Sequence, residues 1–203
     1  MTTLSTTIAL APPRSARPER RPLPGDLAIW IFIAAELLVF GVLFVVYAFA
    51  RRGHVADFNA GQALLDQTTG LVNTWVLMTS SYAVVRATQA MQGGGARSCV
   101  RWLLVAMALG LVFCALKFAE FHRDAGLGIT LSASLFDMFY LLLAGFHFLH
   151  VLMGLAMLAF VTLKAHRGGY DRHSHSGLES VASYWHMVDL VWIVLFALVY
   201  VAH

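Results

Sequence analysis

One acidic side chain, Glu36, lies near the middle of an otherwise uncharged run that extends from Leu27 to Ala50. A charged side chain at membrane depth costs about 2.5 to 3.5 kcal/mol on insertion scales, so Glu36 marks either a functional site or a buried structural contact. Because burial favours the uncharged form of a carboxyl group, we expect Glu36 to be largely protonated at neutral pH unless a cation lies beside it. Asn73 and His147 are its candidate neighbours.

Three histidines in other apolar runs, His147, His150 and His186, could bind a metal or a haem. A haem iron takes its two axial ligands from opposite faces of the ring, so His147 and His150, which share one helix face, could not both bind it. His147 and His186 could. The sequence offers no second pair for a di-haem or copper site, and each histidine has a local partner within reach. We therefore interpret the histidines as hydrogen-bonded packing residues, and predict neither a metal site nor a catalytic residue.

The last apolar run contains a further polar pair. His186 precedes Asp189 by three positions, so the two side chains could form a hydrogen bond on one helix face. Trp185 and Trp192 share the face of Asp189. A bond between His186 and Asp189 would satisfy two groups that lipid leaves without partners.

Two other sets of polar residues have helical spacing. Lys117 and Glu120 are placed for a local ion pair, with His122 close by, and we expect the long Lys117 side chain to extend toward the lipid headgroups. A second set forms a mostly polar or small stripe that should face protein, because lipid disfavours such residues. Its members, at spacings of three or four, are Asp137, Tyr140, Ala144, His147, Val151 and Gly154.

The composition identifies an integral membrane protein. Hydrophobic residues make up 59% of the 203 positions and charged residues only 12%, and the mean hydropathy is +0.72, whereas soluble domains carry roughly 25% charged residues. Since a transmembrane helix needs about 20 mainly apolar residues, the sequence predicts an all-α bundle of five spans. The predicted spans are 27–50, 71–91, 99–121, 135–163 and 181–202.

The basic residues predict the orientation of this bundle. Ten of the 14 Lys and Arg lie in the N-terminal segment and in the second and fourth connecting regions, and four lie in the first and third. By the positive-inside rule, the N-terminus is cytoplasmic and the C-terminus is outside. The net charge of +3 therefore reports topology and not nucleic-acid binding. Residues 1–24, which contain five prolines, are predicted to be a disordered cytoplasmic tail, and residues 25–203 one transmembrane domain.

Five segments, in chain order, share their pattern with one family of membrane subunits. They are GDLAIWIFIAAELLVFGVLFVVYAF with Glu36, LVNTWVLMTSS with Asn73, KFAEFH with Glu120, AGFHFLHVLMG with His147 and His150, and YWHMVDLVWIVLFALVY with Trp185, His186, Asp189 and Trp192. Together they resemble cytochrome c oxidase subunit III, the accessory membrane subunit of haem-copper oxidases, from Gly25 to the C-terminus. The resemblance places Glu36 at the carbodiimide-reactive glutamate of that family.

The number of spans indicates which branch of this family the chain resembles. Larger members have seven spans, whereas this chain has five and begins at the helix that corresponds to the third. It therefore resembles the short branch, which includes quinol oxidase subunit III and the accessory protein of nitric oxide reductase. In the seven-span members the first two helices form one wall of a lipid-filled cleft, so here a partner would have to supply that wall.

The resemblance implies a multi-pass subunit of the bacterial cytoplasmic (inner) membrane that binds no haem or copper itself. It would lie beside the catalytic subunit of a haem-copper oxidase or nitric oxide reductase, which holds the haem and any copper. Its implied roles are to stabilise that subunit, to support proton uptake and to bind phospholipid.

Two other functions stay open at this point. A small transporter or proton channel could use the buried acids Glu36, Glu120 and Asp137, although the sequence contains no repeated half or pair of broken helices that would support transport. A membrane haem protein using His147 and His186 is the second alternative. It predicts a visible absorption band in the isolated chain.

Overall fold

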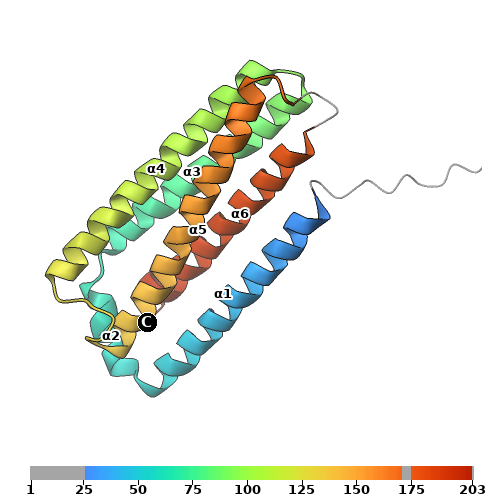
Figure 1. The fold of residues 1–203 in the computed structure, drawn as a ribbon. Helices are drawn as coiled ribbons and strands as arrows, with labels where there is room; N and C mark the ends of the chain where they lie inside the picture. Colours follow the sequence, from blue (N-terminus) through green and yellow to red (C-terminus); the bar gives the residue numbers. More distant parts are fainter. Residues whose placement is uncertain (1–25, 171–174, 203) are drawn as a thin grey trace, which may run out of the picture.

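The computed structural model describes residues 26–170 and 175–202, and the regular elements in these ranges are all helices (Figure 1). The predicted all-α fold is therefore confirmed, while the predicted tail 1–24 lies outside the described residues. The helices are α1 (Leu27–Gly53), α2 (Val55–Leu64), α3 (Gln67–Gln92), α4 (Ala96–Gly126), α5 (Leu135–His166) and α6 (Ser176–Phe196), which continues as a π-helical turn, η1 (Ala197–Val201).

Four of the long helices form a closed bundle. α3 packs against α4, α4 against α5, α5 against α6, and α6 back against α3. α1 lies at the edge of this bundle against α6 and α5, as Figure 1 shows. Only 11% of the most apolar stretch of α1 is buried within the chain, compared with 56% for the last helix. Most of the α1 surface therefore faces outward.

Four of the described helices are long and apolar enough to cross a membrane: α1, α4, α5, and α6 with its π-helical continuation. The helix in the predicted second span, α3, is not among them, because hydroxyl and amide side chains lower its hydropathy. At 26 residues it is nevertheless as long as the last span. Its polar residues Asn73, Ser80 and Ser81 are buried against the other helices, as expected for a helix inside a bundle.

The short helix α2 was not predicted from the sequence, where its residues were assigned to a connecting region. Its ten residues follow α1 after one residue, His54. Phe58 is fully buried against Tyr47 and Phe139, and the Gln62 amide donates to the backbone oxygen of Val199 at 3.0 Å. α2 therefore ties α1 to the end of the last helix.

The connection between α3 and α4 is a tight turn. Three glycines join α3 to α4, and Gly94 adopts a φ of 81°, in the left-handed region that favours glycine. The backbone N–H of Gly95 donates to the oxygen of Ala90 at 2.8 Å and closes the turn.

Asp66 caps the N-terminus of α3. Its Oδ1 accepts from the backbone N–H groups of Thr68 and Thr69 at 3.0 and 3.2 Å, and its Oδ2 accepts from the Thr69 hydroxyl at 2.7 Å and from Arg123 at 3.2 Å. These bonds, those from Thr69 above all, lower the pKa of Asp66 from 3.8 to about 2. The folded state therefore prefers the ionised carboxylate more strongly than the unfolded chain does.

We predict that Asp66→Ala costs about 1 kcal/mol of stability at neutral pH, because the helix loses its N-cap. Since the pKa of Asp66 is lowered on folding, the stabilisation is present above about pH 4 and disappears as the pH falls through about 2. Thermal melting in mild detergent at several pH values measures this difference. Asp57→Ala, which removes an exposed carboxylate in α2, is the control. A difference between wild type and Asp66→Ala that persists below about pH 2 would contradict the assignment.

Candidate functional site

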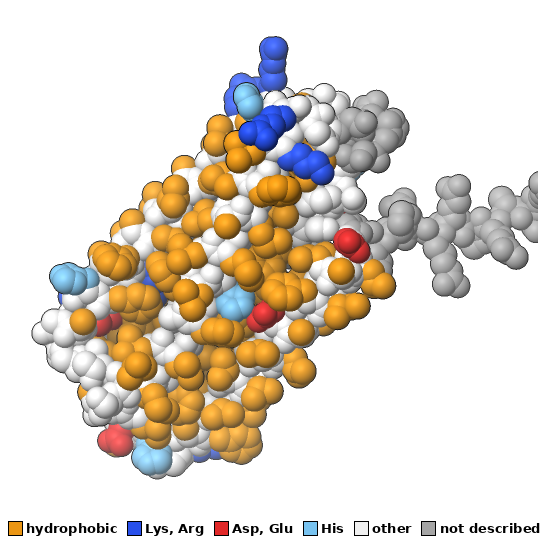
Figure 2. All heavy atoms as spheres, viewed as in Figure 1, with side chains coloured by type: hydrophobic (Ala, Val, Ile, Leu, Met, Phe, Trp, Pro, Cys, Tyr) orange, Lys and Arg blue, Asp and Glu red, His pale blue; other side chains and the backbone are white. Residues whose placement is uncertain are grey.

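Glu36 meets a histidine from another helix. Its Oε2 lies 3.0 Å from Nε2 of His150 on α5, and the two side chains are 19% and 8% exposed. The sequence suggested Asn73 or His147 as the neighbour of Glu36. The structure places His150 there, so that suggestion was wrong. In Figure 2 an acidic side chain and a histidine lie side by side within the largely apolar face of the bundle. The pair joins the edge helix α1 to the closed bundle.

The second ring nitrogen of His150 bonds to the backbone of its own helix. Nδ1 lies 2.8 Å from the backbone oxygen of Phe146, which can only accept, so Nδ1 carries a hydrogen. Nε2 of His150 then accepts a hydrogen bond from a protonated Glu36 carboxyl group when the ring is neutral, or donates one to the Glu36 carboxylate when the ring is charged. Either arrangement gives one hydrogen bond between α1 and α5.

Aromatic rings surround the pair on the α1 side. Phe40 contacts His150 edge-on, with the ring centroids 5.2 Å apart. Tyr184 of α6 stacks on Phe32 at 6.0 Å, and its hydroxyl donates to the backbone oxygen of His150 at 3.3 Å. These contacts restrict the His150 ring and exclude most lipid from the bond to Glu36.

His147 is enclosed without a hydrogen bond. It is 1% exposed, and neither ring nitrogen has a partner within the part of the chain that the structure describes. Its ring lies against Trp192 at 5.2 Å, Phe113 at 6.0 Å and Phe40 at 6.5 Å. The expectation of a local hydrogen-bonding partner was therefore wrong for His147. Three aromatic rings from α1, α4 and α6 therefore pack around the His147 imidazole.

The predicted hydrogen bond between His186 and Asp189 is not present, and His186 contacts α3 instead. Nδ1 of His186 lies 2.5 Å from the Ser81 hydroxyl of α3, and the structure shows no bond between His186 and Asp189. The predicted pair is therefore wrong, because a serine on the adjacent helix occupies the imidazole. Oδ1 of Asp189 is buried without a partner among the described residues. The contact joins α6 to α3.

Trp192 contacts α3 next to the buried Asn73. The Trp192 indole donates to the Thr74 hydroxyl at 3.0 Å, and that hydroxyl donates to the backbone oxygen of Gly70 at 2.9 Å. Asn73 is fully buried, and within residues 26–170 and 175–202 neither amide atom has a hydrogen-bond partner. The two residues are thus inside the bundle, as the sequence predicted.

Trp185 occupies space that two glycines leave open. A Cβ on Gly154 of α5 would lie 2.8 Å from the Trp185 ring, and a Cβ on Gly110 of α4 would lie 3.0 Å from it. The side chain is 1% exposed. Trp185 therefore fills the interior where α4, α5 and α6 meet.

Lys117 and Glu120 form a buried ion pair at the end of α4. The Lys117 ammonium lies 3.1 Å from Oε2 of Glu120, and the two side chains are 0% and 1% exposed. Tyr200 of η1 bonds to both, at 2.6 Å from the ammonium and 2.6 Å from Oε1 of Glu120. Tyr140 of α5 donates toward Asp124 at 2.8 Å and Glu120 at 3.2 Å. We refer to these five residues as the Lys117 cluster.

The structure corrects the orientation predicted for Lys117. The predicted ion pair with Glu120 is confirmed, but the side chain points into the bundle and not toward the headgroups. Its ammonium also lies within 5.4 Å of the ring centroids of Phe121, Tyr140, Trp192 and Tyr200. Asp124 and Tyr200 were missed as members of the cluster. The spacing of Lys117, Glu120 and Asp124 by three and four positions on one helix face was the available signal for Asp124.

Asp137 begins the predicted stripe on α5. It is 8% exposed and lies in the first turn, where a negative side chain is favourable near the helix N-terminus. Its backbone N–H donates to the Ser134 hydroxyl at 3.0 Å. Among the described residues no group of three or more His, Cys, Asp and Glu side chains is arranged to hold a metal ion.

Comparison with known proteins identifies relatives along almost the whole helical region. The family model for cytochrome c oxidase subunit III matches residues 25–202. The chain is 36% identical over 172 residues to the cytochrome c oxidase subunit 3 of Synechocystis sp., covering 84% of this chain and 72% of the relative. It is 30% identical over 176 residues to the same subunit of Thermostichus vulcanus, covering 86% of each. A Staphylococcus aureus protein named Probable quinol oxidase subunit 3 is 29% identical over 174 residues, covering 86% of this chain and 87% of that protein.

Proposed function

Because the chain belongs to the cytochrome c oxidase subunit III family, we propose that it is a non-redox accessory subunit of a respiratory haem-copper oxidase. It stabilises the catalytic subunit, binds membrane lipid and supports proton uptake. The observation that carries this proposal is the family match from residue 25 to residue 202. The buried polar side chains of the described residues support it, since they mainly join helices to one another.

The exposed surface of α1 supports a role in binding a partner or lipid. Large apolar side chains cover it, and a bundle in water would not present so many. Those more than half exposed include Ile31, Leu38, Val42, Val45 and Phe49. We propose that this face is covered in the assembled complex by lipid or by another subunit.

We propose that the chain crosses the bacterial cytoplasmic membrane five times, with α3 as the fifth spanning helix. At about 1.5 Å per residue, the 26 residues of α3 extend roughly 39 Å, which exceeds the ~30 Å hydrocarbon core. The distribution of Lys and Arg supports a cytoplasmic N-terminus and an external C-terminus.

The catalytic partner supplies the redox cofactors in this proposal. This chain binds neither haem nor copper, and the enclosure of His147 by aromatic rings supports that assignment. The identity of the partner distinguishes an oxidase from a nitric oxide reductase.

Affinity purification of the tagged chain from its native membrane in mild detergent tests the proposal. We expect a haem spectrum that appears only together with a copurifying catalytic subunit, which peptide identification then assigns. Haem bound to the isolated chain would overturn the proposal. So would a colourless chain that purifies alone and conducts protons in liposomes, with Glu36→Gln abolishing the flux.

We predict that Glu36→Gln preserves assembly and Glu36→Lys abolishes it. A glutamine amide can still donate to Nε2 of His150, so the bond between the two helices is kept. A lysine would bring an uncompensated positive charge next to an imidazole inside the membrane. The measurement is the yield of copurifying catalytic subunit per tagged chain. Loss of assembly in Glu36→Gln alone would show that the carboxyl group itself is required.

A further inference from the structure

Two arginines lie one helical turn apart at the start of α4. Arg97 and Arg101 are four residues apart, so their side chains are neighbours on the helix, where two like charges disfavour one another. Both are exposed, and within the described parts of the chain neither has a carboxylate partner. An anion bound between them would attract both guanidinium groups and offset their mutual repulsion.

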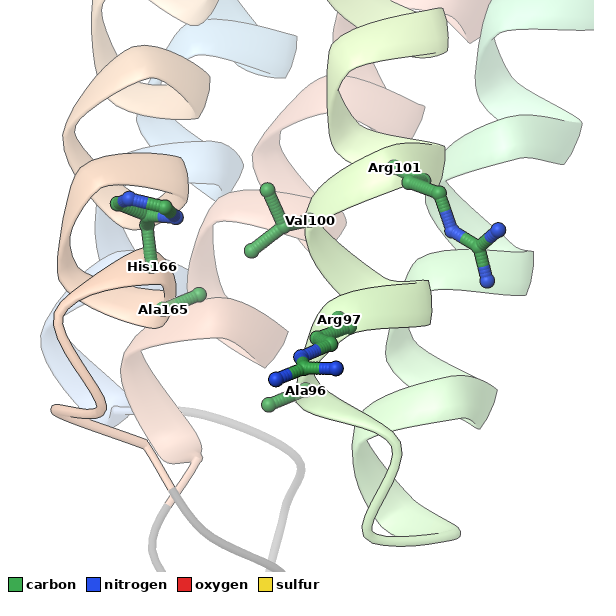
Figure 3. Close-up of a pocket in the computed structure, with 6 residues that line it drawn as sticks. All are labelled: Ala96, Arg97, Val100, Arg101, Ala165 and His166. Atoms are coloured by element: carbon green, nitrogen blue, oxygen red, sulfur yellow. The ribbon is translucent and has the colours of Figure 1, made fainter.

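A cavity of about 490 Å³ opens beside these arginines. Figure 3 shows that its walls come from the start of α4 and the end of α5. Its six lining residues are Ala96, Arg97, Val100, Arg101, Ala165 and His166. The site is thus a concave surface with cationic and hydrogen-bonding side chains at its rim and apolar side chains at its base.

A second cavity continues the first around α4. It has about 320 Å³, and Arg101 lines both cavities, together with Trp102 and Val105 in the second. In Figure 3 the Arg101 side chain extends from α4 on the side away from α5. The Arg86 guanidinium also lies over the Trp102 ring, with its Cζ 5.4 Å from the ring centroid. An indole next to arginines is typical of the level at which lipid headgroups lie.

The surroundings fit a lipid better than a small soluble anion. Farther along the same two helices the surface is apolar and exposed, including Leu104, Leu111, Phe160 and Leu163. Figure 2 shows basic side chains gathered at one end of the bundle, beyond this apolar surface. A phosphate group at the arginines would therefore have its acyl chains alongside apolar helix surface.

We propose that the cavity between the start of α4 and the end of α5 binds the headgroup of an anionic glycerophospholipid, with Arg97 and Arg101 holding its phosphate. His166 contributes a hydrogen bond from the opposite wall. The site deepens the lipid-binding part of the proposed function, and it depends on the membrane placement of the bundle but not on the catalytic partner. Two arginines give selectivity for a net negative lipid over a zwitterionic one.

Native mass spectrometry of the delipidated full-length chain, with any subunit that copurifies, tests this site. The probes are phosphatidylglycerol and phosphatidylcholine with identical acyl chains, added in equal amounts. We expect phosphatidylglycerol to bind at least about fivefold more tightly, and Arg97→Gln/Arg101→Gln to weaken its binding about tenfold or more, since each arginine near a charged membrane surface contributes roughly fivefold. Thermal melting confirms that the variant is folded.

The matched control is Lys164→Gln/Arg167→Gln, which removes the same charge from the same end of the bundle without changing the cavity wall. We expect it to change phosphatidylglycerol binding less than about twofold. Equal binding of the two lipids by the wild type would overturn the proposal, as would an equal loss in both double variants. Crosslinks from positions 97 and 101 to an acidic segment of a partner subunit, without lipid binding, would assign the cavity to a protein instead. None of these results alters the copurification test of the accessory role.

Discussion

Replacing Lys117 with methionine is expected to lower the free energy of unfolding by about 3 to 5 kcal/mol, because it leaves the buried Glu120 carboxylate without its cation. Methionine keeps much of the length of the side chain, so the loss of charge dominates over the loss of volume. Titration of the detergent-solubilised chain with SDS, followed by tryptophan fluorescence, measures the change. The same substitution should release the bond between the ammonium and Tyr200 of η1.

A double-mutant cycle separates the ion pair from other effects at this position. Lys117→Met/Glu120→Gln removes both charges, and the neutral amide can still accept from the Tyr200 hydroxyl. We expect the double variant to recover more than half of the stability that Lys117→Met loses, because the two residues act as one unit. Additive losses in the two single variants would show that the charges are not coupled, and would contradict the role assigned to the pair.

Gly154→Ala is expected to destabilise the bundle by about 1 to 3 kcal/mol, although alanine normally favours a helix. The added Cβ would lie 2.8 Å from the Trp185 ring, which is fixed between α4 and α5 and cannot move away easily. The same SDS titration measures the loss. Trp185→Phe in the Gly154→Ala background should recover part of it, since a smaller ring leaves room for the methyl group.

The matched control lies on the same helix. A Cβ on Gly145 of α5 meets no atom within 4 Å, so Gly145→Ala should be neutral or stabilising by roughly 0.5 to 1 kcal/mol. If both alanine variants destabilised equally, the cause would be a general intolerance of α5 to substitution and not the contact with Trp185.

Local features of this fold were accessible from the sequence. Apolar runs locate five long helices, and the spacing of three between Lys117 and Glu120 predicts their ion pair because one helix fixes both positions. Their ends were less accurate, since helices continue into polar residues beyond an apolar run. α2 was missed because ten residues with only two buried side chains carry little periodic signal.

Contacts between helices were not accessible in the same way. Glu36 and His150 are 114 positions apart, and Ser81 and His186 are 105 apart. Helical periodicity indicates which face of each helix is polar but not which helix packs against that face. Lys117 illustrates the same limit, because its inward orientation depends on Tyr140 and Tyr200 from two other elements.

The separation between Glu36 and His150 has a consequence for biosynthesis. At about 5–20 residues per second, the ribosome adds the intervening 114 residues in roughly 6 to 23 s. During that interval α1 has neither α5 nor α6 to pack against, because both follow it in the chain. α1 can therefore pack against α5 and α6 only after these helices have been synthesised. Glu36 is therefore synthesised well before the histidine that bonds to it, and the contact between the two can form only after α5 has been made.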